Sequence, residues 1–131
     1  MSDRKWRILL VDDEPSILKI VGKRLQVEGY DVVVAADGQE AMEKTKEVHP
    51  DLIVLDLMLP KIDGYKVCRT LKFDERYRNL PILILSARSG EQDRQLALSM
   101  GADAFVTKPY DMRDLVTRIR ARLGVVRREA A

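Results

Sequence analysis

Short apolar runs alternate along the chain with longer segments in which apolar residues recur at helical spacing. The first run, at residues 8–11, contains only Ile, Leu and Val, and the acidic pair Asp12 and Asp13 follows it. An unbroken run of branched apolar residues is typical of a strand buried on both faces. In the next segment Pro15 suits the first turn of a helix, and Gly29 lies just past its end. The pattern therefore predicts a strand followed by a helix.

The same alternation continues to the end of the chain. The predicted strands are residues 8–11, 32–35, 52–55, 82–85 and 104–107, and the predicted helices are 15–27, 38–48, 65–72, 91–100 and 112–123. Buried strands that alternate with helices favour right-handed crossovers, and so an α/β fold with a doubly wound, five-stranded parallel sheet and helices on both faces. The periodicity does not give the order of the strands.

Polar residues with related chemistry follow four of the five predicted strands. They are Asp12 and Asp13 after the first strand, Asp56 after the third, Ser86 after the fourth, and Thr107 at the end of the fifth with Lys108 and Pro109 after it. Ligand sites of open parallel sheets lie at the carboxyl ends of the strands. If these four strands adjoin, three carboxylates, a hydroxyl and an ammonium converge on one pocket. The second strand is followed by Asp37 and Gly38, which are more typical of a turn and a helix cap.

Three close carboxylates repel one another, so a countercharge is needed to keep all of them ionised. Oxygen ligands without His or Cys suit Mg²⁺, which usually takes one or two carboxylates together with phosphate oxygens. With Lys108 and Ser86 nearby, such a site is equipped for phosphoryl transfer to a carboxylate. Taken alone, Asp12 or Asp13 could equally be a helix N-cap. The joint pattern at four strand ends favours the site.

Length and composition restrict the class of protein. The 131 residues suffice for one domain, and 46% hydrophobic with 34% charged residues is typical of a globular fold. The net charge of +2 does not by itself indicate a nucleic-acid or membrane partner. The single cysteine, Cys68, excludes an intrachain disulfide, and the lack of an apolar leader at residues 1–7 favours a cytoplasmic location. No apolar run approaches the roughly 20 residues of a membrane span.

Five segments together resemble the receiver domain of two-component response regulators. They are residues 10–14, 56–64, 85–87, 101–103 and 108–109. The resemblance covers residues 6–123 and implies the CheY-like, flavodoxin-like strand order 2-1-3-4-5. Residues 124–131, which include Arg127 and Arg128, would be a tail or the start of a linker to an effector domain.

The resemblance implies roles for the acidic residues. Asp56 would be phosphorylated by a sensor histidine kinase or a histidine phosphotransfer protein. Asp13, Asp56 and the backbone carbonyl of Met58 would ligate Mg²⁺, with Asp12 acting largely through bound water, and Mn²⁺ would be able to substitute. Met58 and Arg88 would flank the phosphoryl group and restrict an attacking water, so we expect a long-lived phosphoryl group.

The resemblance also implies a switch. Lys108 would pair with Asp56 and then with the phosphoryl group, and Pro109 would follow a cis peptide bond. Ser86 would hydrogen-bond a phosphoryl oxygen, and Phe105 would swing inward, which repacks the face made by the fourth helix, the fifth strand and the fifth helix. Phe105 has no hydroxyl to mimic the tyrosine of other members, and the alternative for it is a plain core residue.

Receivers with winged-helix output domains often form phosphorylation-dependent homodimers through this face. Charged residues fall at similar positions here, namely Arg94, Asp103, Asp114 and Arg118. Ala104 stands where that subfamily has a second Asp. A helix face that is simply exposed to solvent is therefore as good an interpretation of these charges as a dimer interface.

Residues 111–131 contain six Arg and three acidic residues and so carry a net charge of +3. Direct nucleic-acid binding is not expected, because acids are interleaved and no aromatic or Gly-rich motif accompanies the arginines.

Three hypotheses remain. The first is a signalling switch that catalyses only its own phosphorylation and dephosphorylation. The second is a phosphatase of the haloacid-dehalogenase type, which would need Asp-x-Asp-x-Thr after the first strand, where this chain has Asp12, Asp13, Glu14, Pro15 and Ser16. The third is a receiver-like scaffold that is never phosphorylated, which would predict a missing acid or lysine. The sequence favours the first.

Overall fold

A five-stranded parallel sheet forms the centre of the molecule. The structure is a computed structural model that describes residues 5–87 and 90–130. The strands of the described part are β1 (Arg7–Val11), β2 (Asp31–Ala35), β3 (Leu52–Asp56), β4 (Ile82–Ser86) and β5 (Ala104–Thr107). Their order is β2-β1-β3-β4-β5, and every neighbouring pair is parallel. Both the doubly wound class and the strand order implied by the resemblance are confirmed.

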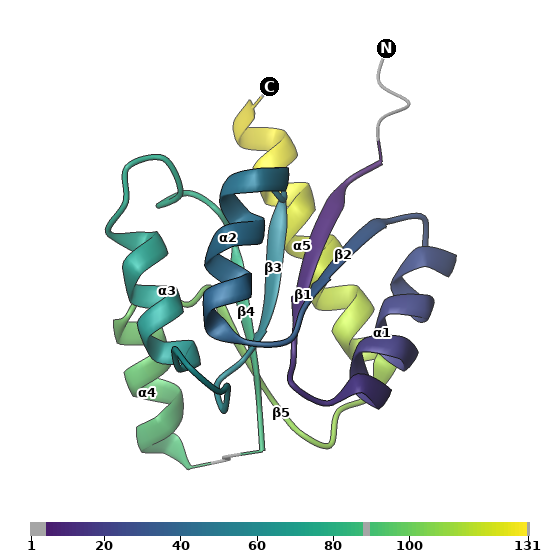
Figure 1. Cartoon of the computed structure of the whole chain (residues 1–131). Helices are drawn as coiled ribbons and strands as arrows, with labels where there is room; N and C mark the ends of the chain where they lie inside the picture. Colours follow the sequence, from purple (N-terminus) through teal and green to yellow (C-terminus); the bar gives the residue numbers. More distant parts are fainter. Residues whose placement is uncertain (1–4, 88–89, 131) are drawn as a thin grey trace.

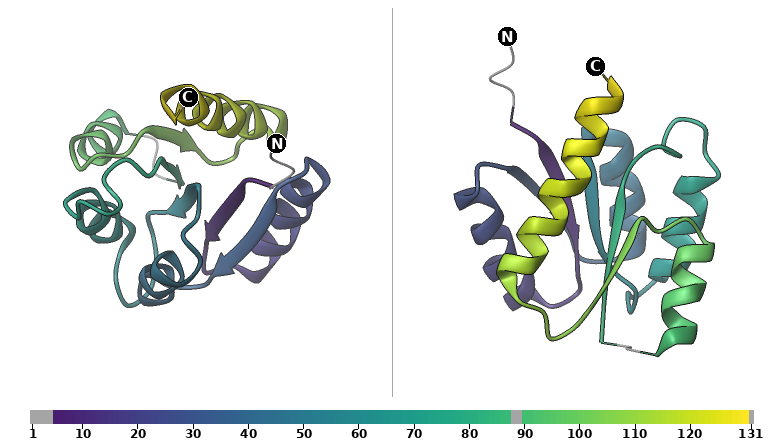
Figure 2. Two further views of the ribbon diagram at one scale, coloured as in Figure 1. Left: turned by 90° about the horizontal axis from the view of Figure 1, so that it is seen from above. Right: turned by 180° about the vertical axis from the view of Figure 1, so that it is seen from behind.

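Helices cover both faces of the sheet (Figures 1 and 2). They are α1 (Pro15–Val27), α2 (Gly38–Val48), α3 (Gly64–Lys72), α4 (Glu91–Ser99) and α5 (Met112–Ala130). Figure 2, seen from above, shows α1 and α5 on one face and α2, α3 and α4 on the other. None of the helices in the described residues is both long enough and apolar enough to span a membrane.

Alternate residues of each strand supply two separate cores. In β1, Ile8 and Leu10 pack with Leu25 of α1 and Ile119 of α5, whereas Leu9 belongs to the cluster under α2, α3 and α4. Successive side chains of a strand point to opposite faces, so a strand covered on both faces must be apolar throughout. This is why the runs that predicted the strands are unbroken.

The last helix is longer than the sequence predicts. The pattern predicts an end at Leu123, before Gly124, but α5 continues to Ala130. Gly29 and Gly101 take positive φ angles, whereas Gly124 does not and stays within the helix. A glycine inside a helix costs only about 1 kcal/mol relative to alanine, so the packed turns before it can carry the helix through. The side chains of Arg127 and Arg128 lie outside the described part of the chain.

Candidate functional site

Three carboxylates meet at the carboxyl ends of the adjacent strands β1 and β3. Asp56 is the last residue of β3, and Asp12 and Asp13 follow β1 directly. Val11 and Leu55 are paired in register, which brings these strand ends together. One oxygen from each carboxylate lies within 4.8 Å of the others. Asp12 and Asp56 are buried, at 1% and 5% exposure, whereas Asp13 is exposed to solvent.

Neither Asp12 nor Asp13 is the N-cap of α1. The N-cap residue is Glu14, and its side chain makes no capping hydrogen bond. Oδ1 of Asp12 instead accepts from the backbone N–H of Glu14 at 2.9 Å. This bond fixes the Asp12 side chain in the turn and leaves Oδ2 to accept from the ammonium of Lys108. The helix-cap alternative for Asp12 therefore does not describe its place in the fold.

Lys108 joins two of the carboxylates. Its Nζ lies 3.1 Å from Oδ2 of Asp12 and 3.3 Å from Oδ2 of Asp56. The backbone N–H of Lys108 donates to the carbonyl of Ser86 at 2.7 Å, and the Lys108–Pro109 peptide bond is cis. Burial works to lower the pKa of Lys108, but the hydrogen bond to Asp12 and the negative charges of both carboxylates outweigh it and raise the pKa. Lys108 is therefore firmly charged at neutral pH.

Asp56 has an environment different from that of an ordinary surface carboxylate. Burial, the strongest influence, raises the pKa of Asp56, and the charge of Asp12 adds to this. The N–H of Met58, 3.1 Å from Oδ1, and the ammonium of Lys108 act in the opposite direction. Because the net shift is upward, an additional cation would be needed to offset the remaining cost of charge burial.

The hydroxyl and aromatic residues expected at the switch lie on the neighbouring strands. Ser86 ends β4, is fully buried, and is paired in register with Thr107 of β5. Phe105 of β5 is only 6% exposed and packs in the core beneath α2, α3 and α4. In this structure the ring already lies inward, where the plain core alternative would also place it. Arg88, expected beside the phosphoryl group, lies outside the described residues.

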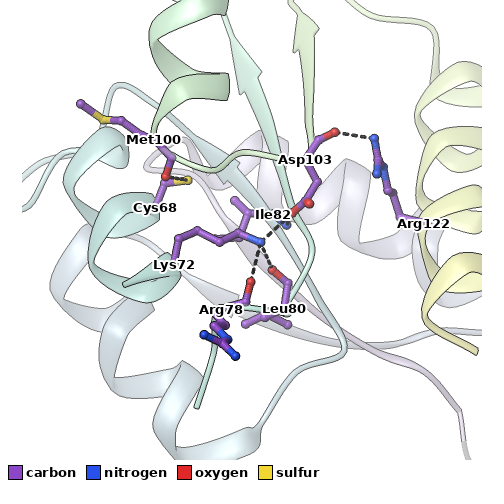
Figure 3. Close-up of polar contacts among 8 residues, drawn as sticks. All are labelled: Cys68, Lys72, Arg78, Leu80, Ile82, Met100, Asp103 and Arg122. Atoms are coloured by element: carbon purple, nitrogen blue, oxygen red, sulfur yellow. Dashed lines mark hydrogen bonds and ion pairs between the residues drawn. The ribbon is translucent and has the colours of Figure 1, made fainter. Parts of the chain in front are cut away.

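The four charged residues of the expected dimer face do not behave alike. Arg94, Asp114 and Arg118 are exposed, and Nε of Arg118 lies 3.0 Å from Oδ2 of Asp114 one helical turn away. The carboxylate of Asp103 instead binds Nζ of Lys72 at 2.9 Å (Figure 3). The half-buried carboxylate of Asp103 therefore makes a contact within the molecule that sequence reasoning missed.

The fold and this site together identify the class of protein. The sequence model of the response regulator receiver domain matches residues 8–120, so the chain belongs to the response regulator receiver domain family. The structure resembles a receiver domain protein (CheY-like) from Methanospirillum hungatei, with a TM-score of 0.90, 28% identity, and coverage of 96% of this chain and 99% of that one. The beryllofluoride-activated receiver domain of RstA from Klebsiella pneumoniae gives a TM-score of 0.81 at 32% identity, covering 89% and 97%.

Similar curated proteins are transcriptional regulators by name. The probable transcriptional regulator ycf27 of Porphyridium aerugineum is 47% identical over 118 residues, which cover 90% of this chain and 48% of that protein. The DNA-binding dual master transcriptional regulator RpaA of Synechocystis is 44% identical and is matched over 89% and 48%. The chain thus spans about half the length of the curated relatives it matches. The family match does not favour a haloacid-dehalogenase phosphatase.

Proposed function

We propose that this chain is a phosphorylation-activated switch in which Asp56 accepts a phosphoryl group from the phosphohistidine of a sensor histidine kinase or a histidine phosphotransfer protein. The observation that carries the proposal is that Lys108 forms ion pairs with the buried carboxylates of Asp12 and Asp56, which lie at the ends of adjacent strands. No external substrate is turned over, because the accepting group is part of the chain itself.

The donor set fits a hard divalent cation. Asp12, Asp13 and Asp56 offer only carboxylate oxygens, and the nearby backbone carbonyl of Met58 would complete the protein ligands. Oxygen ligands of this kind suit Mg²⁺, and Mn²⁺ shares the preference. When bound, the ion neutralises charge on the oxygens of the transferring phosphoryl group.

The residues of this chain have distinct parts in the transfer. An oxygen of Asp56 attacks phosphorus, the bond from phosphorus to the imidazole nitrogen breaks, and the imidazole leaves and takes a proton from solvent. The N–H of Met58 holds Oδ1 of Asp56 during the attack. Lys108, already 3.3 Å from Asp56, pairs with the phosphoryl oxygens as their charge arrives.

Phosphorylation would then favour one of two packings of the face formed by α4, β5 and α5. The phosphoryl group adds close to two negative charges, and the packing that brings the Ser86 hydroxyl and Lys108 onto its oxygens gains charge-assisted hydrogen bonds. A shift from a mostly inactive to a mostly active population requires about 5 kcal/mol of differential binding. Phe105 lies on β5 itself, two residues before Thr107, which is paired in register with Ser86.

What the switch controls is proposed from the names of the similar curated proteins, which are transcriptional regulators. In a protein of about twice this length, the chain would be the receiver that controls a transcriptional regulator, with a homodimer through Arg94, Asp114 and Arg118 as the active form. Direct nucleic-acid binding is not part of the proposal for this chain, because the arginines of α5 are interleaved with acids. A DNA-binding activity would belong to a separate output domain.

Incubation with acetyl phosphate and Mg²⁺ tests the proposal. Intact-mass spectrometry should show one added phosphoryl group, and Asp56→Asn should abolish it. Asp31→Asn is the matched control, because Asp31 is exposed at the start of β2 and pairs with Arg7. If the added mass persists in Asp56→Asn, Asp56 is not the acceptor.

A further inference from the structure

The loop that follows Asp56 lies against the first turn of α2. This loop, residues 57–63, connects β3 to α3, and both segments lie at the lower end of the molecule in Figure 1. The carbonyl of Pro60 accepts from the N–H of Gly38 at 3.4 Å, and Nζ of Lys61 lies 3.4 Å from Oδ2 of Asp37. Two residues at the start of α2 thus hold two residues of the loop.

The first turn of α2 is itself fixed by a reciprocal cap. The carboxylate of Asp37 accepts from the N–H of Glu40 at 2.8 Å, and the carboxylate of Glu40 accepts from the N–H of Ala36 at 2.6 Å. Such a pair of bonds satisfies two backbone donors that the helix cannot use and sets the direction of its first turn. The loop therefore rests on a well-defined support.

Gly38 allows an approach that any side chain would prevent. A Cβ atom at this position would lie 1.9 Å from the carbonyl oxygen of Ile62 and 2.7 Å from its carbonyl carbon. Such distances require a backbone shift, because the obstructing atoms belong to the main chain of the loop. Lys61, next to Ile62, has a φ of 66°, which non-glycine residues seldom adopt. The contacts with α2 hold the loop in this conformation.

The same loop carries the backbone that faces the phosphorylation site. The N–H of Met58 donates to Oδ1 of Asp56 at 3.1 Å, and Met58 is two residues before Pro60. At the other end of the loop, the N–H of Gly64 donates to the carbonyl of Leu57 at 3.0 Å. With its ends tied in this way, a displacement of the loop at Pro60 or Ile62 would also displace the backbone of Met58.

We infer that Gly38 and the Asp37–Lys61 pair are positioning residues for the phosphorylation site. Through the loop they set where the amide and carbonyl of Met58 stand relative to Asp56, and so they tune metal affinity and the rate of phosphorylation. The expected effects on metal affinity and phosphorylation rest on the proposed function. The effect of these residues on the loop can be measured separately, in protein without metal or phosphodonor.

Gly38→Ala tests the inference, with Gly22→Ala as the matched control. A Cβ at Gly22 would meet only the side chains of Leu10 and Val32, both at 3.9 Å, an ordinary contact distance. In the metal-free protein, hydrogen exchange of the Met58 amide measured by NMR should quicken about tenfold in Gly38→Ala and stay unchanged in Gly22→Ala. Groups that orient metal ligands typically change affinity by about 10-fold or more. The Mg²⁺ dissociation constant should accordingly rise about tenfold in Gly38→Ala only.

Lys61→Gln provides a second, milder test if Gly38→Ala does not fold. Exposed ion pairs contribute about 0.2–1 kcal/mol, so Mg²⁺ affinity should fall by up to about fivefold, and Lys61→Arg should restore it. The inference is overturned if the Gly38 and Lys61 variants lower the melting temperature while Met58 exchange and Mg²⁺ affinity stay at wild-type values. If the wild-type protein takes no phosphoryl group, the proposed function is refuted instead. Hydrogen exchange of the Met58 amide would then still test whether Gly38 and Lys61 position the loop.

Discussion

The ammonium of Lys72 lies 2.9 Å from Oδ2 of Asp103 and joins the end of α3 to the turn before β5 (Figure 3). The same ammonium donates to the carbonyls of Arg78 and Leu80, and Asp103 also accepts from the N–H of Ile82. Ile82 begins β4 and Asp103 immediately precedes β5, so this cluster lies at the amino edge of the sheet, opposite Asp56. It therefore holds the fold without taking part in the proposed phosphorylation site.

Lys72→Met should lower the free energy of unfolding by about 1–3 kcal/mol, because Asp103 and two carbonyls lose a mostly buried donor. Urea denaturation measures the loss. Lys66→Met, an exposed position on the same helix, should change stability by less than about 0.5 kcal/mol. Equal stability of the Lys66 and Lys72 variants would show that the cluster contributes nothing. Phosphorylation by acetyl phosphate should be retained in both variants.

Asp56→Asn should stabilise the metal-free protein at neutral pH. Burial raises the pKa of Asp56 in the folded chain, and an acid with a raised folded pKa destabilises the fold wherever it is ionised. The gain in melting temperature should shrink as pH falls through the raised pKa and vanish below the ordinary value near 3.8. Thermal unfolding between pH 3 and 8 checks this, and a lower melting temperature for the variant at pH 7 would contradict it.

Lys108→Ala should separate metal binding from switching. Removing a positive charge beside three carboxylates should leave Mg²⁺ affinity unchanged or tighter, because like charges repel. Signal transmission should fail, since no ammonium remains to pair with the phosphoryl oxygens. Calorimetric titration with Mg²⁺, together with chemical-shift changes of β5 and α5 on adding beryllofluoride, checks both parts. A severe loss of Mg²⁺ affinity would contradict the role assigned to Lys108.

Cys68 should resist alkylation in the native protein. The thiol is 1% exposed, donates to the carbonyl of Met100 at 3.7 Å, and burial raises its pKa to about 11. At pH 8 the thiolate fraction should be at least about 100-fold below that of an ordinary cysteine, since the ordinary pKa is about 8.5. Iodoacetamide labelling followed by mass spectrometry should be slow in buffer, quicken with rising pH, and be fast in urea. Full native labelling within minutes at pH 8 would exclude this environment.

The oligomeric state should respond to the phosphoryl group if the face of α4, β5 and α5 is a dimer interface. Light scattering with beryllofluoride and Mg²⁺ should then report a dimer, and Arg94→Glu should weaken it, whereas Lys23→Glu on α1 should not. Asp103→Asn should destabilise the monomer rather than the dimer, because its carboxylate binds Lys72. A monomer under all conditions would remove the dimer from the proposal.

Much of this architecture follows from local sequence. Strands buried on both faces leave unbroken apolar runs, and parallel strands bring their following residues to one edge. Together with the strand order that the family resemblance implies, this pattern groups Asp12, Asp56 and Lys108. The Lys72–Asp103 pair joins residues 31 positions apart and depends on how α3 packs beside β4 and β5, which periodicity does not encode. The contact of Gly38 with Ile62 likewise arises only from packing.

The predicted end of α5 is wrong for a different reason. A glycine is a strong helix terminator when its backbone takes a positive φ, as Gly29 does after α1. At Gly124 the chain keeps helical geometry. In the sequence, Gly29 and Gly124 each follow an amphipathic segment and look alike. The sequence therefore does not tell the glycine that ends a helix from the one that lies within it.

The length of α5 gives the receiver a mechanical property. Arg122 donates to the carbonyl of Asp103, and Arg120 pairs with Glu28 of α1 at 3.0 Å, so the helix is anchored near its middle. At 1.5 Å per residue, about 15 Å of helix lies on the Met112 side of Arg122 and about 12 Å on the Ala130 side. Leu115 and Ile119 of the same helix are buried in the core, so a movement of these packed turns would carry the whole helix with it, and a displacement delivered beside Pro109 would be transmitted to the Ala130 end.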